Sequence, residues 1–151
     1  MINITRLKTF NTEVLAEINR LLVQMSLTNV PPKALTGLVS KDILSQKNVH
    51  LLVAKGGDNK DQKLVGMLTL YFIGMPSGLF AIMEDLIVDK PYRKWGVGRL
   101  LVEEGIKLAS QKKARHISLR TNPKRVEANR LYRAMGFKLM PTNFYRINIF
   151  K

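Results

Sequence analysis

The chain has 151 residues and carries 25 Lys and Arg against 11 Asp and Glu, a formal net charge of +14. Its length suits one domain with a single core, and its 46% hydrophobic and 24% charged residues are ordinary for a globular protein. It contains no cysteine, which excludes disulfides, thiolate metal sites and a cysteine nucleophile, and fits a reducing compartment. We therefore expect a single cytoplasmic domain over residues 1–151.

The sequence predicts neither a membrane segment nor a metal site. The first ten residues, MINITRLKTF, have no basic segment followed by an apolar run, so we expect no signal peptide. No apolar stretch reaches the roughly 20 residues that cross a bilayer. Two histidines, His50 and His116, are too few to predict a metal centre.

The spacing of apolar residues predicts two helices and four strands before residue 90. Asn11 or Thr12 is the expected cap of the first helix, and Pro31 and Pro32 separate the two helices. Glycine-containing segments at 56–62 and 75–78 predict turns. The predicted elements are a strand at 3–9, helices at 11–26 and 34–46, and strands at 50–55, 63–74 and 79–89.

After residue 90 the predicted elements are a helix at 97–113, a strand at 116–121, a helix at 124–135, and strands at 137–140 and 144–150. Asn122 followed by Pro123 predicts the start of the second of these helices, and Gly136 predicts its end. The order of elements indicates an α/β fold. We expect a mixed, mostly antiparallel central sheet flanked by about four helices.

The positive charge is concentrated in the later part of the chain. Residues 1–89 contain 9 Lys and Arg against 8 Asp and Glu, whereas residues 90–151 contain 16 against 3. A field of this sign raises the local concentration of anions. A solvated surface that keeps the protein in solution explains any single lysine, but it explains so uneven a distribution less well.

A glycine-containing loop, Arg93-Lys94-Trp95-Gly96-Val97-Gly98, joins a predicted strand to a predicted helix. It is not the loop of a nucleotide hydrolase, because Gly98 is followed by Arg and Leu instead of Lys and Ser or Thr. It also lacks the third glycine of a dinucleotide-binding loop, since Leu101 stands there. Backbone N–H groups at a helix start bind anions, so the loop is a candidate phosphate site.

A downstream segment, TNPKRVEANRLYRAMGFK at 121–138, combines Asn129, Tyr132 and Gly136-Phe137 behind a predicted strand. Together with MEDLIVDKPYRKWGVGRLL upstream, it resembles the GNAT superfamily of acetyl-CoA-dependent N-acetyltransferases. The two matching motifs cover about residues 83–138, and the order of elements extends the resemblance over nearly the whole chain. In that family the strand before the loop splays from its neighbour, and acetyl-CoA enters the gap.

The resemblance implies a role for each matching residue. Backbone groups of Leu86, Ile87 and Val88 would bond the pantetheine arm and the thioester carbonyl. Asn129 would contact the arm, and Tyr132 would lie near the sulfur. The backbone N–H groups that would hold the pyrophosphate belong to Arg93, Lys94, Trp95, Gly96, Val97, Gly98 and Arg99. No metal is implied.

The chemistry of acetyl transfer suggests a base and an acid. A lysine-like amine has a pKa of about 10.4, so making it neutral at pH 7 costs about 4–5 kcal/mol. Glu84 is the first candidate base, directly or through a water, and Asp85 is the second; we expect the two to point to opposite faces of their strand. The alternative is that both are strand-edge carboxylates, one of them paired with a nearby arginine. Tyr132 is the candidate acid, and its alternative role is core packing.

Several questions about partners stay open on the sequence. The acceptor is a peptide or protein amine, or a small amine such as an amino sugar. A basic nucleic-acid-binding protein and a coenzyme A-binding sensor are the rival hypotheses for the same scaffold. We favour direct attack of the amine in a ternary complex, without a covalent acyl-enzyme. The final segment FYRINIF could pair between subunits, and homodimers are common among proteins of this type.

Overall fold

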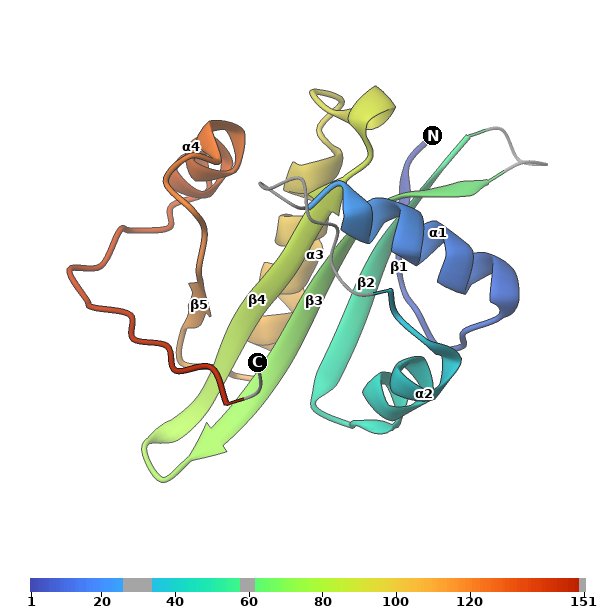
Figure 1. The fold of residues 1–151 in the computed structure, drawn as a ribbon. Helices are drawn as coiled ribbons and strands as arrows, with labels where there is room; N and C mark the ends of the chain where they lie inside the picture. Colours follow the sequence, from blue (N-terminus) through green and yellow to red (C-terminus); the bar gives the residue numbers. More distant parts are fainter. Residues whose placement is uncertain (26–33, 58–61, 150–151) are drawn as a thin grey trace. The chain divides into compact units, whose positions relative to one another are not determined.

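Five strands form one sheet in the order β1-β2-β3-β4-β5, and the sheet organises the first 120 residues (Figure 1). The first four strands pair antiparallel and β5 joins β4 in parallel, so the predicted mixed, mostly antiparallel sheet is confirmed. The strands are β1 (Asn3–Arg6), β2 (Val49–Gly56), β3 (Lys63–Met75), β4 (Gly78–Val88) and β5 (Ile117–Leu119).

This computed structural model describes residues 1–25, 34–57 and 62–149. The predicted break at Pro31 and Pro32 and most of the predicted turn at 56–62 lie outside the described residues. Backbone contacts divide the chain into two compact units, residues 1–120 and residues 121–151. Each unit is described by itself, and the single domain expected from the sequence stays a prediction.

Helices cover both faces of the sheet in the first unit. Helices α1 (Thr12–Val23) and α2 (Gly37–Ser45) lie on one face and α3 (Val97–Gln111) lies on the other (Figure 1). A short 3₁₀ helix, η1 (Lys90–Tyr92), stands between β4 and α3. With α4 (Val126–Ala134) in the second unit, four α-helices and a five-stranded sheet give the predicted α/β fold.

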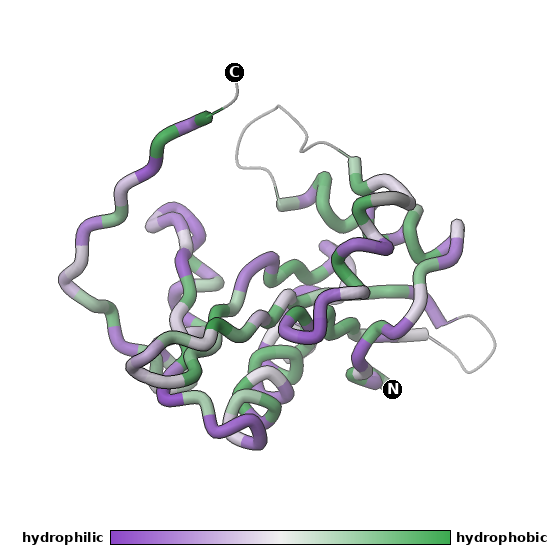
Figure 2. Tube along the Cα trace, turned by 90° about the horizontal axis from the view of Figure 1, so that it is seen from below, coloured by the Kyte–Doolittle hydropathy of each residue, from purple (hydrophilic) through white to green (hydrophobic). Residues whose placement is uncertain are grey.

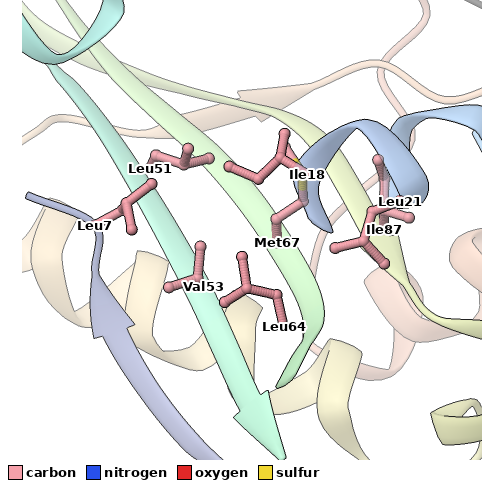
Figure 3. Close-up of a cluster of buried hydrophobic side chains, with 8 residues drawn as sticks. All are labelled: Leu7, Ile18, Leu21, Leu51, Val53, Leu64, Met67 and Ile87. Atoms are coloured by element: carbon pink, nitrogen blue, oxygen red, sulfur yellow. The ribbon is translucent and has the colours of Figure 1, made fainter. Parts of the chain in front are cut away.

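The face of the sheet under α1 is closed by an apolar cluster. Asn11 begins α1 as predicted, because its side chain accepts a 2.7 Å hydrogen bond from the backbone N–H of Val14. The helix then presents Ile18 and Leu21, both fully buried, to the sheet. Figure 3 shows them among Leu7, Leu51, Val53, Leu64, Met67 and Ile87.

Two glycines let the opposite face approach α3 closely. A Cβ on Gly66 of β3 would lie 3.0 Å from the carbonyl oxygen of Ile87 and 3.2 Å from a methyl of Val97. A Cβ on Gly105 of α3 would lie 2.6 Å from the Met83 side chain. The N-terminal turn of α3 is therefore packed directly onto β3 and β4, where the glycine loop ends.

The start of α4 differs from the prediction. The helix begins at Val126 with Arg125 as its cap, and no side chain caps it. Asn122 instead closes a turn: its side chain accepts from the N–H of Lys124 at 2.9 Å and its carbonyl from the N–H of Arg125 at 2.9 Å. The Asn-Pro pair therefore marks a turn before the helix. Gly136 follows the last residues of α4 with a left-handed φ of 88°, as its predicted role requires.

The two strands predicted at 137–140 and 144–150 are wrong over the described residues 137–149, which are in neither strand nor helix. Apolar and polar residues do alternate along this segment, as Figure 2 shows near the C-terminus. Alternation makes a strand only where a second strand supplies hydrogen bonds and covers the apolar face. Here the large apolar side chains of the segment stay exposed: Leu139, Met140, Phe144, Tyr145, Ile147 and Ile149.

None of the helices within the described part of the chain is both long and apolar enough to cross a bilayer.

Candidate active site

β4 contains a β-bulge at Asp85. Met67 of β3 pairs with Ile87, and Thr69 pairs with Glu84, so a single β3 residue between them faces two residues of β4. Asp85 adopts a left-handed φ of 53°, which is uncommon for a residue other than glycine. Such a bulge bends the strand and redirects its side chains, and bulges are frequent next to active sites.

Glu84, next to the bulge, lies on the face of the sheet that α1 covers. Met67 belongs to the apolar cluster under α1, and Thr69 and its partner Glu84 lie on the same face by the period of two. Strict alternation was expected to separate Glu84 and Asp85, and that expectation is wrong. The Asp85 carboxylate accepts a 3.0 Å hydrogen bond from the hydroxyl of Thr69, so both acids serve the same region.

Past the bulge, β4 has no strand on its outer edge among the described residues. Its parallel pairing with β5 covers only Ala81–Met83, so residues 84–88 continue without a β5 partner. On the side of β4 that faces β3, the backbone N–H of Asp89 donates to the carbonyl of Val65 at 2.9 Å. Because successive residues of a strand direct their backbone groups to alternate sides, the N–H and C=O of Val88 point away from β3. The splayed strands expected from the resemblance therefore correspond to this edge, which carries Leu86, Ile87 and Val88.

The glycine loop follows that edge directly. Lys94 and Gly96 have left-handed φ values of 67° and 79°, and Gly96 is the N-terminal cap of α3 without any side-chain cap. The N–H groups of the first turn of a helix have no partner inside the helix. No atom lies within 4 Å of the position of a Cβ on Gly96, so the space beside the loop is open to a ligand.

The side chains of the loop give it a positive charge. Arg93, Lys94 and Arg99 are exposed, and Arg93 Nε donates to the carbonyl of Val88 at 3.0 Å. That bond fixes the guanidinium beside the unpaired edge of β4. Arg99 also pairs with Glu103 one turn along α3, at 2.8 Å. Trp95 is 70% exposed and contacts the ring of Tyr92, whereas Val97 is buried.

Glu84 is paired with Arg120, as the alternative hypothesis from the sequence required. Nη2 and Nε of Arg120 donate to Oε1 of Glu84 at 2.7 Å and 3.0 Å. The hydrogen bonds and charge of Glu84 raise the pKa of Arg120, so the guanidinium stays charged. Both bonds reach the same oxygen, and Arg120 therefore holds the carboxylate without occupying Oε2.

Arg120 and Thr69 are site residues that sequence reasoning missed. Arg120 lies 36 positions from Glu84 along the chain, and only the parallel β4–β5 register brings the two together. Thr69 is one residue of an apolar strand, and its contact with Asp85 depends on the bulge. The two-residue alternation of a strand could have placed Arg120 and Thr69 on the face under α1, but it could not show that they contact Glu84 and Asp85.

The second unit holds the remaining two predicted site residues on α4. Nδ2 of Asn129 donates to the carbonyls of Arg125 at 2.9 Å and Asn122 at 3.1 Å, so its amide group ties the helix start to the preceding turn. Tyr132 is half-buried, and its ring meets that of Phe137 edge-on with centroids 5.8 Å apart. The carbonyl of Tyr132 also accepts from the N–H of Phe137 at 3.0 Å.

Metal ligation is not indicated by these geometries. Within residues 1–25, 34–57 and 62–149, no three His, Asp or Glu side chains are grouped so that they could hold a metal ion. Among the described residues neither ring nitrogen of the buried His50 has a hydrogen-bond partner, and the ring of His116 contacts that of Phe80 at a tilt of 55° with centroids 4.7 Å apart.

Comparison with known proteins places this site in a family context. The sequence model of the Acetyltransferase (GNAT) family matches residues 19–137. A transcriptional regulator from Bacillus halodurans C-125 is 25% identical with a TM-score of 0.79, and the match covers 99% of this chain and 100% of that chain. No curated protein sequence matches the chain.

Two further solved structures share the fold. The acetyltransferase AAC(6')-Iy in complex with the bisubstrate analog CoA-S-monomethyl-acetylneamine is 19% identical, with a TM-score of 0.75 over 98% of this chain and 99% of that chain. An aminoglycoside acetyltransferase from an uncultured soil metagenomic sample, in complex with trehalose, is 21% identical, with a TM-score of 0.77 over 97% and 96%.

Proposed function

Because the chain belongs to the GNAT acetyltransferase family, we propose that it transfers an acetyl group from acetyl-CoA to a primary amine of an amino sugar. The transfer takes place by direct attack in a ternary complex. The observation that carries the proposal is the unpaired edge of β4 at residues 84–88, which begins at a bulge and leads directly into the glycine loop. One strand thereby presents a carboxylate, a free backbone edge and a cationic loop in sequence.

The residues present fit the phosphates and arm of acetyl-CoA. The N–H groups at the start of α3, the open space beside Gly96 and the exposed Arg93 and Lys94 suit a pyrophosphate. The edge of β4 at Leu86 to Val88, which has no β5 partner among the described residues, suits the amide-containing pantetheine arm, because amides donate and accept as a neighbouring strand would. Acetyl-CoA supplies the activated acyl group as a thioester.

The reaction requires one proton to leave the amine and one to reach the sulfur. The amine nitrogen forms a bond to the acetyl carbon, the carbon–sulfur bond breaks, and the thiolate takes up a proton. We assign the first proton to Oε2 of Glu84, directly or through a water, because the two hydrogen bonds that join Arg120 to Glu84 in the described part of the chain both reach Oε1. We assign the second to the phenol of Tyr132. General acid and base groups of this kind contribute about 10²–10⁴-fold each.

An amino sugar is the acceptor that the α1 face suits best. Asp85 is bonded to a neutral hydroxyl, that of Thr69, and among the described residues no salt bridge joins it to a cation. A cationic ammonium group would supply the missing charge. Aminoglycoside acetyltransferases share the fold, and their substrates carry amines on sugar rings.

The first experiment is thermal unfolding with excess acetyl-CoA and, separately, excess ATP at physiological salt. A ligand at 100 times its dissociation constant stabilises the folded state by about 2.7 kcal/mol, which corresponds to a shift in Tm of about 5–11 °C for a chain of this length. We expect the shift with acetyl-CoA and not with ATP. Equal shifts would indicate nonspecific anion binding, and no shift would contradict the proposal.

The second experiment identifies the acceptor by the release of free thiol from acetyl-CoA. Sisomicin and glucosamine represent amino sugars, spermidine represents polyamines, and a lysine-containing peptide represents protein amines. We expect thiol release, with one acetyl group added per thiol by mass spectrometry, for an amino sugar. Turnover with the peptide alone would replace the amino sugar by a protein amine as acceptor.

A further inference from the structure

We propose that Arg20 and Gln24, at the end of α1, act as positioning residues that hold Asp89 and thereby set the glycine loop for the pyrophosphate of coenzyme A. This inference rests on the proposed function, because it concerns the same cofactor site. The affinity for coenzyme A would then depend on α1, although α1 and α3 lie on opposite faces of the sheet.

Asp89 is the junction between β4 and the loop, and α1 bonds both of its carboxylate oxygens. Nη1 of Arg20 donates to Oδ2 at 2.5 Å, and Nε2 of Gln24 donates to Oδ1 at 2.8 Å. The same two side chains bond the neighbouring backbone: Nη2 of Arg20 donates to the carbonyl of Leu64 at 2.8 Å, and Oε1 of Gln24 accepts from the N–H of Lys90 at 3.1 Å.

Backbone hydrogen bonds connect Asp89 to the start of the glycine loop. Its N–H donates to the carbonyl of Val65 at 2.9 Å, which fixes it to β3, and its carbonyl accepts from the N–H of Tyr92 at 2.9 Å. The carbonyl of Lys90 then accepts from the N–H of Arg93 at 3.3 Å. A single 3₁₀ turn therefore separates the carboxylate held by α1 from the first residue of the loop.

Asp89 needs its partners because it is buried. It is 8% exposed, and burial alone would raise its pKa. The hydrogen bonds from Gln24 and Arg20 and the charge of Arg20 outweigh burial and lower the pKa below its ordinary value. Removing one partner of a surface aspartate would change its free energy little, because water replaces the lost contact. A buried carboxylate that has lost its cation instead moves or takes up a proton.

A positioning role makes a specific prediction about ligands. If the junction is released, the loop populates several conformations, and the observed dissociation constant rises in inverse proportion to the fraction of protein that stays competent to bind. Only ligands that contact the loop are affected. Pantetheine ends before the phosphates and reports the β4 edge alone, whereas coenzyme A reports the edge and the loop together.

The test measures both dissociation constants by NMR titration for the wild type, Arg20→Met and Gln24→Met. We expect the dissociation constant of coenzyme A to rise about tenfold in each variant, as for a loop that is competent about a tenth of the time, while that of pantetheine changes less than about twofold. Arg20→Lys should lie between, because lysine keeps the charge but lacks the planar guanidinium whose two terminal nitrogens reach Asp89 and Leu64 separately.

Lys107→Met is the matched control, because it removes an exposed salt bridge to Glu104 on α3 and should change neither constant. If Arg20→Met does not fold, Arg20→Met with Asp89→Asn removes the buried charge as well and should show the same difference between ligands. Equal losses for both ligands, or no loss for either, would overturn the inference. A wild type that binds no coenzyme A contradicts the proposed function instead.

Discussion

At the residue scale, the environment of Glu84 decides what that side chain can do. Arg120 donates twice to Oε1, so the carboxylate is oriented but retains an oxygen for the acceptor. Asp85, one position further on, lies at the bulge and accepts a hydrogen bond from the hydroxyl of Thr69. The two acids therefore differ in role: we assign the proton to Glu84 and binding of the ammonium to Asp85.

Replacing Glu84 by Gln should lower kcat/KM about a hundredfold at pH 7, since Gln keeps a partner for Arg120 but cannot take a proton. The loss should shrink as the pH approaches the pKa of the acceptor, because more amine is already neutral. Initial rates from pH 6 to pH 9 measure this. Asp85→Asn is the control and should raise KM for the acceptor more than it lowers kcat. An unchanged rate in Glu84→Gln at pH 7 would remove the assignment.

Replacing Tyr132 by Phe should reduce kcat about a hundredfold, at the lower end of the range for a general acid. Phe retains the ring contact with Phe137, so the affinity for acetyl-CoA should stay within about twofold of the wild type. Steady-state kinetics combined with a direct binding measurement separate the two. Unchanged turnover would show that Tyr132 serves packing alone.

His50 makes folding sensitive to acid. Burial, together with the charges of Arg6 and Lys112, lowers its pKa from 6.5 to about 4, and neither ring nitrogen has a hydrogen-bond partner within the described residues. Between pH 6.5 and pH 4 the unfolded chain therefore binds a proton at His50, whereas the folded protein does not. Stability from this residue is complete above pH 6.5 and is lost as the pH falls towards 4, by up to about 3 kcal/mol.

Urea unfolding at several pH values tests this consequence of a buried histidine. We expect the free energy of unfolding of His50→Leu to fall less than that of the wild type between pH 7 and pH 4, by about 3 kcal/mol. Above pH 7 the difference between the two proteins should be constant. Parallel curves over the whole range would contradict the assignment.

At the scale of elements, periodicity predicted which elements form but not where they change direction. The apolar runs at 50–55, 63–74 and 79–89 gave three strands close to the observed bounds, because each is long and strongly patterned. The bulge at Asp85 was not predictable, since no glycine marks it. The strands expected after residue 136 were wrong because an alternating pattern does not identify the strand that would pair with it.

Gly66→Ala tests the close approach of α3 to the sheet. The new methyl group would meet the carbonyl oxygen of Ile87 at 3.0 Å and side chains of Leu101 and Val97 at 3.1 Å and 3.2 Å. Overpacking of this kind costs about 1–3 kcal/mol, and here it also displaces the start of α3. Gly74→Ala on the same strand has nothing within 4 Å and should be nearly neutral. Urea unfolding of both variants gives the comparison.

At the scale of the whole molecule, features made of neighbouring residues could be predicted from the sequence, whereas contacts between distant residues could not. The glycine loop and its cations are contiguous, so a phosphate site can be proposed there from the residues alone, and that assignment stays a prediction. The pair of Glu84 and Arg120 and the anchoring of Asp89 by Arg20 join residues 36 and 69 positions apart. Such contacts depend on strand register and helix docking, which a local pattern does not contain.

The uneven charge should act mainly on the rate of cofactor binding. Residues 90–151 carry 16 basic against 3 acidic residues, and a field of this sign attracts an anionic ligand before contact. We expect the association rate of coenzyme A to fall by about tenfold or more between low and high salt, while the dissociation rate changes less. Stopped-flow binding at several salt concentrations measures both. Equal changes in the two rates would show that steering is not involved.

The bulge in β4 divides one strand into two separate frames of alternation. Before it, Ile82 and Glu84 share a face with Thr69 and Tyr71 of β3, and after it Ile87 returns to that face three residues on. Side chains before Asp85 can therefore be substituted to change which acceptor binds, while the residues after the bulge keep their faces of the sheet. Deleting one residue at the bulge would join the two frames with Ile87 still in the core under α1, and it would remove the bend that the bulge gives the strand. The inserted residue thus bends β4 between the acceptor side and the cofactor side while Glu84 and Ile87 keep the same face.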